Sequence, residues 1–160
     1  MEPVDVVGVR MEMPSNTPIV LLRQQNGNLY VPIWVGAVEA TSIAFAQQRV
    51  APPRPLTHDL VLTIVDALDA SLDHVEITDL RDGVYYASLH FVGGQEIDAR
   101  PSDAIALAIR AEVPILIAPE VVAEAGIALP DEEEPEEEVE RFREFLDHVS
   151  PEDFLEPGSG

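Results

Sequence analysis

The amino-acid sequence predicts an α+β domain made of two similar halves, each with three strands followed by a helix. Three observations predict this fold: two runs of strand-like segments broken by tight-turn signals, a change to helical spacing after each run, and a proline-rich linker between the halves. We expect a mixed or antiparallel sheet packed with helices in a domain at residues 1–130, followed by an acidic tail at 131–160.

The first half is predicted to form strands at residues 4–11, 19–23 and 29–34. Asn26-Gly27 lies between the second and third strands and is a strong hairpin signal, because both turn positions require positive φ. After Gly36 the apolar residues take helical spacing, which predicts a helix to about Val50. The segment 51–55, with three prolines, then imposes an extended linker.

A second helix is predicted to run from Thr57 to about Ala70. Thr57 is a suitable N-cap, and Asp59 lies in the first turn, where the helix dipole favours a carboxylate. Its apolar residues recur at helical spacing and predict one apolar face: Leu60, Ile64, Ala67 and Leu68.

The second half repeats the plan, with strands predicted at residues 75–80, 84–92 and 95–100 and turns at Asp82-Gly83 and Gly93-Gly94. Ser102 is the expected N-cap of a helix that reaches Ala111. A buried strand at 113–118 and a short helix at 119–125 follow. Glu39-Ala40 can be overlaid on Asp103-Ala104, which favours an internal duplication.

Charge is distributed unevenly along the chain, whose net charge is −21. Residues 131–160 hold 13 acidic residues and 2 arginines, so they carry −11, while residues 1–130 carry −10. The nine basic residues are all arginines. Nucleic-acid-binding proteins normally present a basic face, so this balance argues against tight nucleic-acid binding. The like-charge block 131–138 is typical of disorder, and 139–149 predicts an amphipathic helix that docks on the domain or on a partner.

Composition also limits the compartment and the kinds of site. The sequence has no cysteine, no apolar run of about 20 residues that would span a bilayer, and no signal-peptide pattern at its start. We therefore expect a cytoplasmic protein without membrane contact or an organic cofactor. Because so small a domain leaves strand edges uncovered, we also expect a homo-oligomer, with a dimer favoured.

Polar residues that suit catalysis gather at the predicted helix starts. Asp59 and Asp103 suit the first turns of their helices and Glu39 has the same structural explanation, so capping is one interpretation of all three. Arg100 precedes a helix, where a cation opposes the dipole. It is expected either to pair with Asp98 or Asp103, or to bind a phosphate together with the N–H groups after Ser102.

His58 is the histidine best placed for acid–base chemistry, because the second position of a helix after a proline-rich linker is expected to expose it. A surface or hydrogen-bonded histidine is the alternative. Metal chemistry is the other option, since carboxylates from both halves suit Mg²⁺ or Mn²⁺ and Asp98 and Asp103 are its candidate ligands. The sequence contains no P-loop, G-x-G-x-x-G, H-E-x-x-H or G-x-S-x-G motif, and no specific Ser/His/Asp set is predicted.

Four strings resemble the bifunctional nuclease domain family, formerly a domain of unknown function: PIWVGAVEATSIAFA (32–46), PRPLTHDLV (53–61), ITDLRDGVYYASL (77–89) and DARPSDAIALAIRAEVPI (98–115). The Arg-for-Lys bias and the Ala and Pro content resemble an actinobacterial member. The family name comes from plant members described as degrading RNA and DNA. The polar residues that match the motif pattern are Glu39, Arg54, Thr57, His58, Asp59, Asp79, Asp82, Asp98, Arg100, Ser102 and Asp103.

Two departures from the family pattern bear on the interpretation. Leu68-Asp69-Ala70 replaces the usual Leu-Gly-Ala, so a different C-cap is expected for that helix. The Glu-rich tail replaces an extra C-terminal segment of the plant members, and it would repel nucleic acid or imitate it and occupy a site reversibly.

Two hypotheses follow from the sequence. In the first, the chain is a nuclease: His58, Asp59 and Glu39 are catalytic, Arg54, Arg100 and Ser102 bind the substrate, and Asp98 and Asp103 hold a metal ion. In the second, it is a non-enzymatic regulatory or interaction module whose tail binds a basic protein. Convergence of His58, Arg54 and Arg100 on one cleft with acids would favour the enzyme, and their use in internal pairs would favour the module.

Overall fold

The structure, a computed structural model, describes residues 1–129. The first half is a three-stranded antiparallel meander followed by a helix: β1 (Glu2–Glu12), β2 (Thr17–Gln24), β3 (Leu29–Trp34) and α1 (Ala37–Gln48). β3 has the predicted bounds, whereas β1 and β2 each extend beyond theirs. The linker at 51–55 then leads into α2 (Thr57–Ala67), which ends three residues before the predicted end.

The second half repeats the meander and the helix: β4 (Leu72–Arg81), β5 (Val84–Phe91), β6 (Glu96–Ala99) and α3 (Pro101–Ala111). Three short elements complete the described chain: β7 (Ile115–Ile117), α4 (Pro119–Ala125) and β8 (Ile127–Ala128). The two-residue strand β8, which pairs with β3, was not predicted because it lies just after the Gly126 helix stop and is too short to show a pattern.

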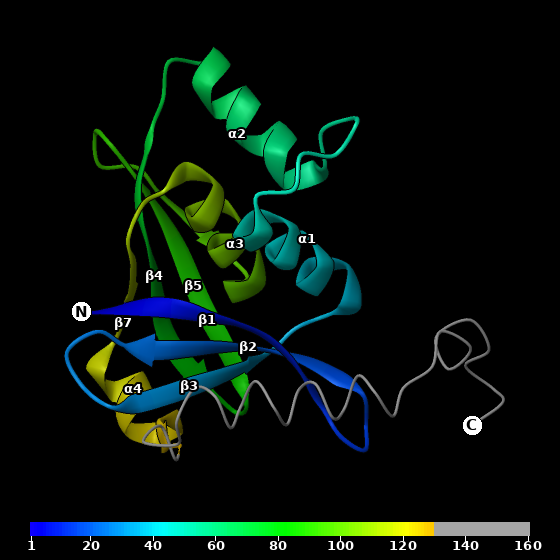
Figure 1. The fold of residues 1–160 in the computed structure, drawn as a ribbon. Coiled ribbons are helices and arrows are strands. Elements are labelled where there is room, and N and C mark those ends of the chain that lie inside the picture. The colour runs from blue at the N-terminus through cyan, green and yellow to red at the C-terminus, as the bar shows by residue number, and fades with distance from the viewer. Residues whose placement is uncertain (130–160) are drawn as a thin grey trace, which may run out of the picture. The chain divides into compact units, whose positions relative to one another are not determined.

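All eight described strands form one mixed sheet in the order β6-β5-β4-β7-β1-β2-β3-β8. β7 lies between the two meanders, parallel to β4 and antiparallel to β1. The sheet twists strongly, so β1–β3 and β4–β5 run in clearly different directions (Figure 1). The predicted duplicated α+β plan is confirmed, and β7 is the element that makes the two halves one sheet.

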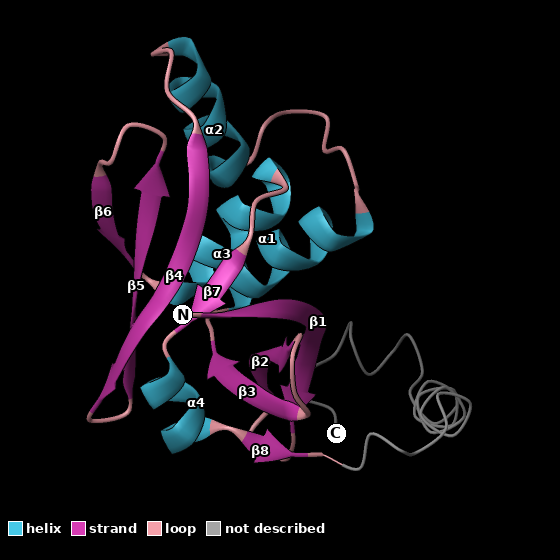
Figure 2. Ribbon diagram, turned by 90° about the vertical axis from the view of Figure 1, so that its left-hand side faces the viewer, coloured by secondary structure: helices cyan, strands magenta, loops and turns pink. Residues whose placement is uncertain are grey.

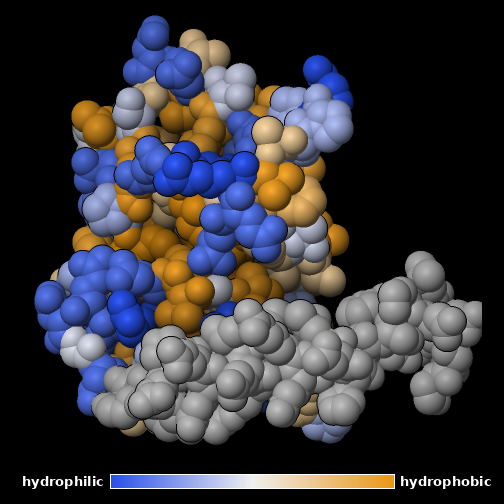
Figure 3. Space-filling view, viewed as in Figure 1, coloured by the Kyte–Doolittle hydropathy of each residue, from blue (hydrophilic) through white to orange (hydrophobic). Residues whose placement is uncertain are grey.

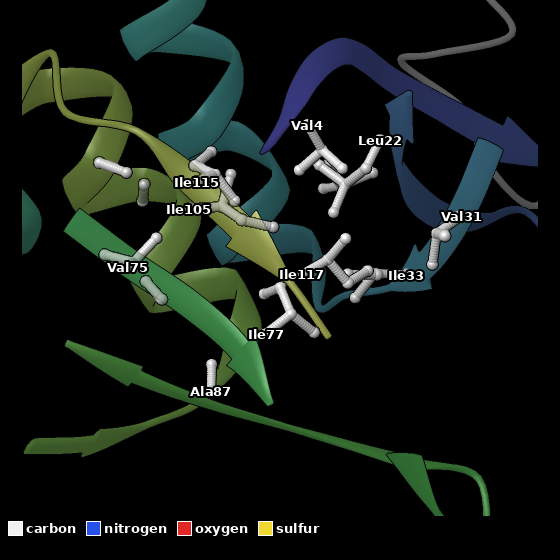
Figure 4. Packing of buried hydrophobic residues seen from close by; sticks show 14 of the residues in the cluster. Val4, Leu22, Val31, Ile33, Val75, Ile77, Ala87, Ile105, Ile115 and Ile117 are labelled. Atoms are coloured by element: carbon white, nitrogen blue, oxygen red, sulfur yellow. The ribbon is translucent and has the colours of Figure 1, made fainter. Parts of the chain in front are cut away.

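The helices α1, α2 and α3 lie together on one side of the sheet (Figure 2). The short helix α4 lies apart from them and contacts β3 and β4. α1 and α3 pack against each other, and α3 also packs on β4 and β5. The core fills the inner face of the sheet, and Figure 4 shows its members from both halves meeting around Ile105 and Ile117. Burial of these aliphatic side chains is the main source of stability.

The predicted N-caps were wrong by one or two residues. Leu56 is the N-cap of α2 and Arg100 is that of α3, so Thr57 and Ser102 lie inside their helices. In α2 the carboxylate of the third helical residue takes over part of the capping function, whereas α3 begins with Pro101 and has no side-chain capping hydrogen bond. For α2 the backbone N–H of Leu56 donates to Asp59 Oδ2 at 2.9 Å.

The C-cap of α2 also differs from the expectation. Asp69 stands where the family usually has glycine, and it adopts the left-handed conformation itself, with φ of 58°. The N–H of Asp69 donates to Asp66 O and that of Ala70 to Val65 O, which is the hydrogen-bond pattern of a Schellman cap. The usual cap is therefore retained with an aspartate in the glycine position.

The apolar stripe of α2 does not enter the core. Leu60, Ile64 and Leu68 are 50%, 49% and 74% exposed, and His58 is the only buried residue of the helix. Apolar and polar side chains are interspersed on the face shown in Figure 3. The predicted amphipathic pattern is present, but its apolar side is a surface of the described domain.

No helix among residues 1–129 is both long and apolar enough to cross a lipid bilayer. The predicted tail helix at 139–149 lies outside the described residues.

Candidate functional site

Three helices present an acidic residue at the same position, the third residue of the helix. These residues are Glu39 in α1, Asp59 in α2 and Asp103 in α3. The helix dipole favours a carboxylate there, so local physics places all three. The equivalence of Glu39 and Asp103 in the two halves agrees with the predicted overlay.

Arg100 joins the two equivalent carboxylates. Its Nη1 donates to Glu39 Oε1 at 2.8 Å, while its Nε and Nη2 donate to Asp103 Oδ2 and Oδ1 at 2.8 and 3.1 Å. These hydrogen bonds raise the pKa of the Arg100 guanidinium. The side chain is nevertheless 64% exposed, so Arg100 lies at the outer edge of the network. Of its predicted partners, Asp103 is confirmed and Asp98 is replaced by Glu39.

His58 links α1 to α3 from its position on α2. Its Nδ1 lies 2.7 Å from Ser42 Oγ and its Nε2 lies 2.8 Å from Asp103 Oδ1. The prediction that His58 is exposed was wrong, because His58 is 9% exposed and Ser42 is 5% exposed. The helix that begins at Thr57 turns its second residue toward α1 and α3 rather than toward solvent.

The charge of Asp103 fixes the proton positions in this chain of contacts. Partial burial pushes the pKa of Asp103 upward, but hydrogen bonds from Arg100 and His58 outweigh that effect and leave the pKa below its ordinary value. Asp103 is therefore ionised at neutral pH and only accepts hydrogen bonds. His58 must carry its proton on Nε2, which leaves Nδ1 of a neutral ring free to accept the Ser42 hydroxyl proton.

Asp59 is held by a different arginine. Arg110, in the last turn of α3, donates from Nε to Asp59 Oδ1 at 2.8 Å and from its other nitrogens to the carbonyls of Ala106 and Ser42, both at 3.1 Å. Burial raises the pKa of Asp59, but the bonds from Arg110 and from the Leu56 N–H lower it by more. Arg110 thereby ties α1, α2 and α3 together beneath His58.

Five of the predicted site residues converge on this network, and three do not. Glu39, His58, Asp59, Arg100 and Asp103 belong to it. Arg54 is exposed in the linker and makes no ion pair with the described residues, and Ser102 is buried in the first turn of α3. Asp98 pairs with Ser88 across β5–β6, on the opposite side of the sheet from α3.

This placement does not form the predicted carboxylate metal centre. Asp98 and Asp103 lie on different sides of the sheet, and the carboxylates of Glu39, Asp59 and Asp103 are each bound by an arginine. Within the described residues these acids do not form a group with metal-ligand spacing. The residues of the network therefore do not fit a resident Mg²⁺ or Mn²⁺ ion in this conformation.

Grooves lie beside the network rather than over His58. One of about 440 Å³ is bordered by Asp59 and Arg110, and a larger one of about 860 Å³ lies between the C-terminal ends of α1 and α3 and strands β1 and β7. Neither groove is lined by His58, Arg54 or Arg100, and His58 and Arg100 are used in internal pairs, which is the arrangement expected from the sequence to favour the module.

The sequence interpretation missed Ser42 and Arg110. Ser42 stands within the family-like string 32–46, which has no catalytic motif, and its pairing with His58 depends on how α1 and α2 are each placed against α3. Arg110 had a detectable signal, because it is the one charged residue after Asp103 in the otherwise apolar stretch AIALAIRA. His74 and His90, which sequence reasoning left aside, also come together, with Glu76, on the opposite sheet face.

Comparison with known proteins gives a consistent family. A protein of Mycobacterium tuberculosis (strain ATCC 25618 / H37Rv), described as uncharacterized, is 50% identical over 161 residues that cover 96% of this chain and 98% of that protein. Bifunctional nuclease 1 of Oryza sativa subsp. indica is 29% identical over 118 residues, and bifunctional nuclease 2 of Arabidopsis thaliana is 31% identical over 114 residues.

The matches to the plant proteins cover 70% and 66% of this chain but only 35% of each plant protein, so the chain spans about a third of their length. The model of the bifunctional nuclease domain matches residues 20–130, which include every residue of the network around His58. This chain therefore belongs to the bifunctional nuclease domain family.

Proposed function

We propose that this chain hydrolyses phosphodiester bonds in RNA or DNA and that His58 is its general base. The observation that carries the proposal is the hydrogen-bonded series Ser42–His58–Asp103, with His58 Nε2 2.8 Å from Asp103 Oδ1. A carboxylate that accepts from one imidazole nitrogen orients the ring and raises the basicity of the other. Family membership and the names of the plant relatives support the same reaction class.

The base nitrogen in this arrangement is Nδ1. It accepts a proton from an attacking oxygen, and in the structure Ser42 Oγ occupies that place at 2.7 Å. The attacking oxygen is that of Ser42 or that of a water molecule that replaces it. It bonds to phosphorus, the bond from phosphorus to the leaving sugar oxygen breaks, and the His58 imidazolium returns the proton to that oxygen. If Ser42 attacks, a water molecule then hydrolyses the phosphoserine. The imidazolium formed in the step is stabilised by the ionised Asp103.

Arg100 is the substrate-binding cation of the proposal. Glu39 and Asp103 bind the exposed guanidinium of Arg100 in the structure. When the substrate binds, Arg100 exchanges one of these carboxylates for a phosphate oxygen. Arg54, exposed in the linker before α2, supplies a second cation for the polynucleotide backbone. Asp59 acts indirectly, because its bonds to Arg110 and Leu56 hold the start of α2 and hence His58.

The experiment is a cleavage assay on the full chain with single-stranded RNA and DNA, each with Mg²⁺, with Mn²⁺ and with EDTA. The variants are His58→Gln, Asp103→Asn and Arg100→Gln. Arg23→Gln is the matched control, because Arg23 is also an exposed arginine paired with a carboxylate, Asp5, but lies on β2. Circular dichroism melts confirm that each variant is folded.

Loss of the base or of its carboxylate is expected to lower kcat by about 100-fold or more. Arg100→Gln is expected to lower kcat/KM by about tenfold or more, and Arg23→Gln to leave it unchanged. Cleavage that persists undiminished in His58→Gln would refute the assignment of the base. Absence of cleavage by the wild-type chain under all these conditions would refute the nuclease.

Ser42→Ala distinguishes the two attacking oxygens. If Ser42 is the nucleophile, the variant loses activity as completely as His58→Gln. If a water molecule attacks, the small side chain makes room for it beside Nδ1 and the activity is retained.

The acidic tail is proposed to inhibit the site by competing with the polyanionic substrate. A chain ending at residue 129 keeps the compact unit Met1–Ala128 and removes the whole tail charge of −11. Higher turnover by this shorter chain would support inhibition, and unchanged turnover would contradict it.

A non-enzymatic regulatory module is the second candidate function, and one observation favours it. Both ring nitrogens of His58 and the Arg100 guanidinium are already bound within the fold. In this case the tail binds a basic protein partner, and no variant or metal produces cleavage. The nuclease assay thus decides between the two candidates.

We also propose that the chain self-associates through the exposed stripe Leu60, Ile64 and Leu68 of α2, with a dimer as the favoured form. Apolar residues that line one face of a surface helix lose contact with water when a second copy covers them.

A further inference from the structure

A second polar cluster lies on strands β4 and β5 and is formed by His74, Glu76 and His90. The two imidazole rings are stacked, with centroids 4.5 Å apart and planes 11° from parallel. His74 Nε2 lies 3.4 Å from Glu76 Oε1, and His90 Nε2 lies 2.9 Å from Glu76 Oε2. One ligand atom from each residue lies within 4.8 Å of the others.

The strand register places this cluster on the sheet face opposite to the helices. His74 pairs with His90 and Glu76 pairs with Ser88 across β4–β5, whereas the alternate residues Val75, Ile77, Ala87 and Leu89 are buried in the core. The three side chains are 16–23% exposed, so solvent reaches them. The cluster is therefore separate from His58 and from the proposed reaction.

Each histidine has a carboxylate at both ring nitrogens. His74 Nδ1 lies 2.6 Å from Asp73 Oδ2, and His90 Nδ1 lies 3.4 Å from Glu96 Oε1. A neutral imidazole has one N–H, so a ring that donates to its Nδ1 carboxylate turns the lone pair of Nε2 toward Glu76. In that tautomer His74 and His90 each have a lone pair on Nε2. The Ser88 hydroxyl lies 2.8 Å from His90 Nε2, so it can donate to the lone pair of His90 and not to that of His74.

The arrangement places a Glu76 oxygen beside each of the two Nε2 atoms. One divalent metal ion between these atoms would bind both Nε2 lone pairs and the carboxylate. Carboxylates behind Nδ1 are the usual outer partners of metal-binding histidines, because they fix the tautomer and make Nε2 a better ligand. Both histidines here have such a partner, Asp73 and Glu96.

We propose that His74, Glu76 and His90 bind a divalent transition-metal ion of the zinc class through the two Nε2 atoms and a Glu76 oxygen. Two imidazoles and one carboxylate form a ligand set that suits zinc and leaves the fourth tetrahedral position open to solvent. Ligand atoms about 2.0–2.1 Å from zinc are about 3.4 Å apart, so the present separations need to shorten by no more than about 1.4 Å.

The test uses the full chain after a chelator has removed any bound metal. The protein is titrated with Co²⁺ and then with Zn²⁺. Excess Mg²⁺ is present throughout, so that it, and not Co²⁺, binds the carboxylates of the acidic tail. Four-coordinate Co²⁺ bound to nitrogen ligands shows strong visible d–d bands that the aqueous ion lacks. The variants are His74→Gln, His90→Gln, Glu76→Gln and Asp73→Asn. Matched controls are His148→Gln, a histidine of the C-terminal segment, and Glu120→Gln, an exposed glutamate on α4.

The expected result is one Co²⁺ per chain with strong visible bands, displaced by Zn²⁺. The bands are lost in His74→Gln and His90→Gln, and both controls keep them. Asp73→Asn weakens binding by about tenfold, which is the effect of removing an outer partner. Zinc raises the Tm of the wild-type chain and not that of the histidine variants.

Absence of the bands in the wild-type chain, or bands that persist in both histidine variants, overturns the proposal. X-ray absorption of zinc-loaded wild-type protein gives a check that needs no variant. Scattering from two imidazoles agrees with the site, and scattering from none or one overturns it.

Discussion

His58 Nε2 lies 2.8 Å from Asp103 Oδ1, and this contact joins the helix after the first half of the chain to the first turn of the helix in the second half. The two residues are 45 positions apart in the sequence. Because Asp103 is also bound by Arg100, which reaches Glu39 on α1, one carboxylate connects all three helices. Changes to this network are therefore expected to affect both stability and chemistry.

Arg110→Gln is expected to destabilise the fold by about 2–3 kcal/mol, because it leaves Asp59 charged without its arginine and removes two bonds to backbone carbonyls. Urea unfolding measures the loss. Arg23→Gln is the matched control, and its exposed pair with Asp5 at 3.8 Å is worth less than about 1 kcal/mol. Equal effects of the two substitutions would contradict the structural importance of Arg110.

Acid is expected to remove the stabilisation that Asp59 and Asp103 provide. Both carboxyls have a pKa below the ordinary value in the folded chain, so their contribution is complete above about pH 4, the ordinary carboxyl pKa, and disappears as pH falls through the folded pKa values. The difference in Tm between wild type and Asp103→Asn should be largest near neutral pH and shrink below about pH 4. Asp66→Asn, which removes an exposed carboxylate of α2, is the control for loss of charge.

Moderate salt is expected not to lower the rate of cleavage if the chain is a nuclease. With a net charge of −21, the protein repels a polynucleotide, and at about 0.15 M salt the screening length is only about 8 Å. kcat/KM on a short oligonucleotide should therefore rise or stay constant up to this concentration. A steep fall, as in nucleases that bind through a basic face, would show that local arginines outweigh the net charge.

Glycine substitutions at two helix ends are expected to stabilise the fold. Arg49 and Glu112 end α1 and α3 with φ of 54° and 56°, a conformation that costs a residue with a side chain about 1 kcal/mol relative to glycine. Glu112→Gly should raise Tm by about 3 °C, since its ion pair with Arg49 is long and exposed. Glu120→Gly, within α4, is the matched control and should lower Tm.

Ile64→Glu together with Leu68→Glu is expected to shift the protein from dimer to monomer in light scattering after size-exclusion chromatography. Both residues are exposed on α2, so the fold should tolerate the change. Val84→Glu with Val92→Glu, at exposed apolar positions around β5, is the control. A monomeric wild-type chain, or a dimer unaffected by the α2 substitutions, would contradict the proposed surface.

The elements of this fold were predictable from the sequence because their signals are local. Asn26-Gly27, the proline linker and the spacing of 104–111 predicted the strands and helices to within a few residues. The turn type at Asn26-Gly27 was wrong, because neither residue has the positive φ that the prediction required. The errors in the helix starts came from neighbouring residues. Thr57 and Ser102 suit an N-cap by propensity, but in α2 the N-cap is Leu56, whose N–H donates to Asp59, and α3 begins with Pro101.

The candidate site was only partly predictable because its contacts are not local. Glu39, Asp59 and Asp103 are placed by helix electrostatics and were found, whereas the burial of His58 and its contact with Ser42 depend on how α1 and α2 are each placed against α3. The His74–His90 pair depends on strand register across β4–β5, which the two histidines alone do not reveal.

The position of β7 between the two meanders has a consequence for synthesis of the chain. β1 and β4 are synthesised early. β7 (Ile115–Ile117), which pairs with both, leaves the ribosome only after the two meanders and helices α1–α3. Until then the nascent chain has two unpaired apolar edges that other chains can extend into aggregates. Truncation just before residue 115 is therefore expected to yield an aggregation-prone product, although it leaves both meanders and their helices intact.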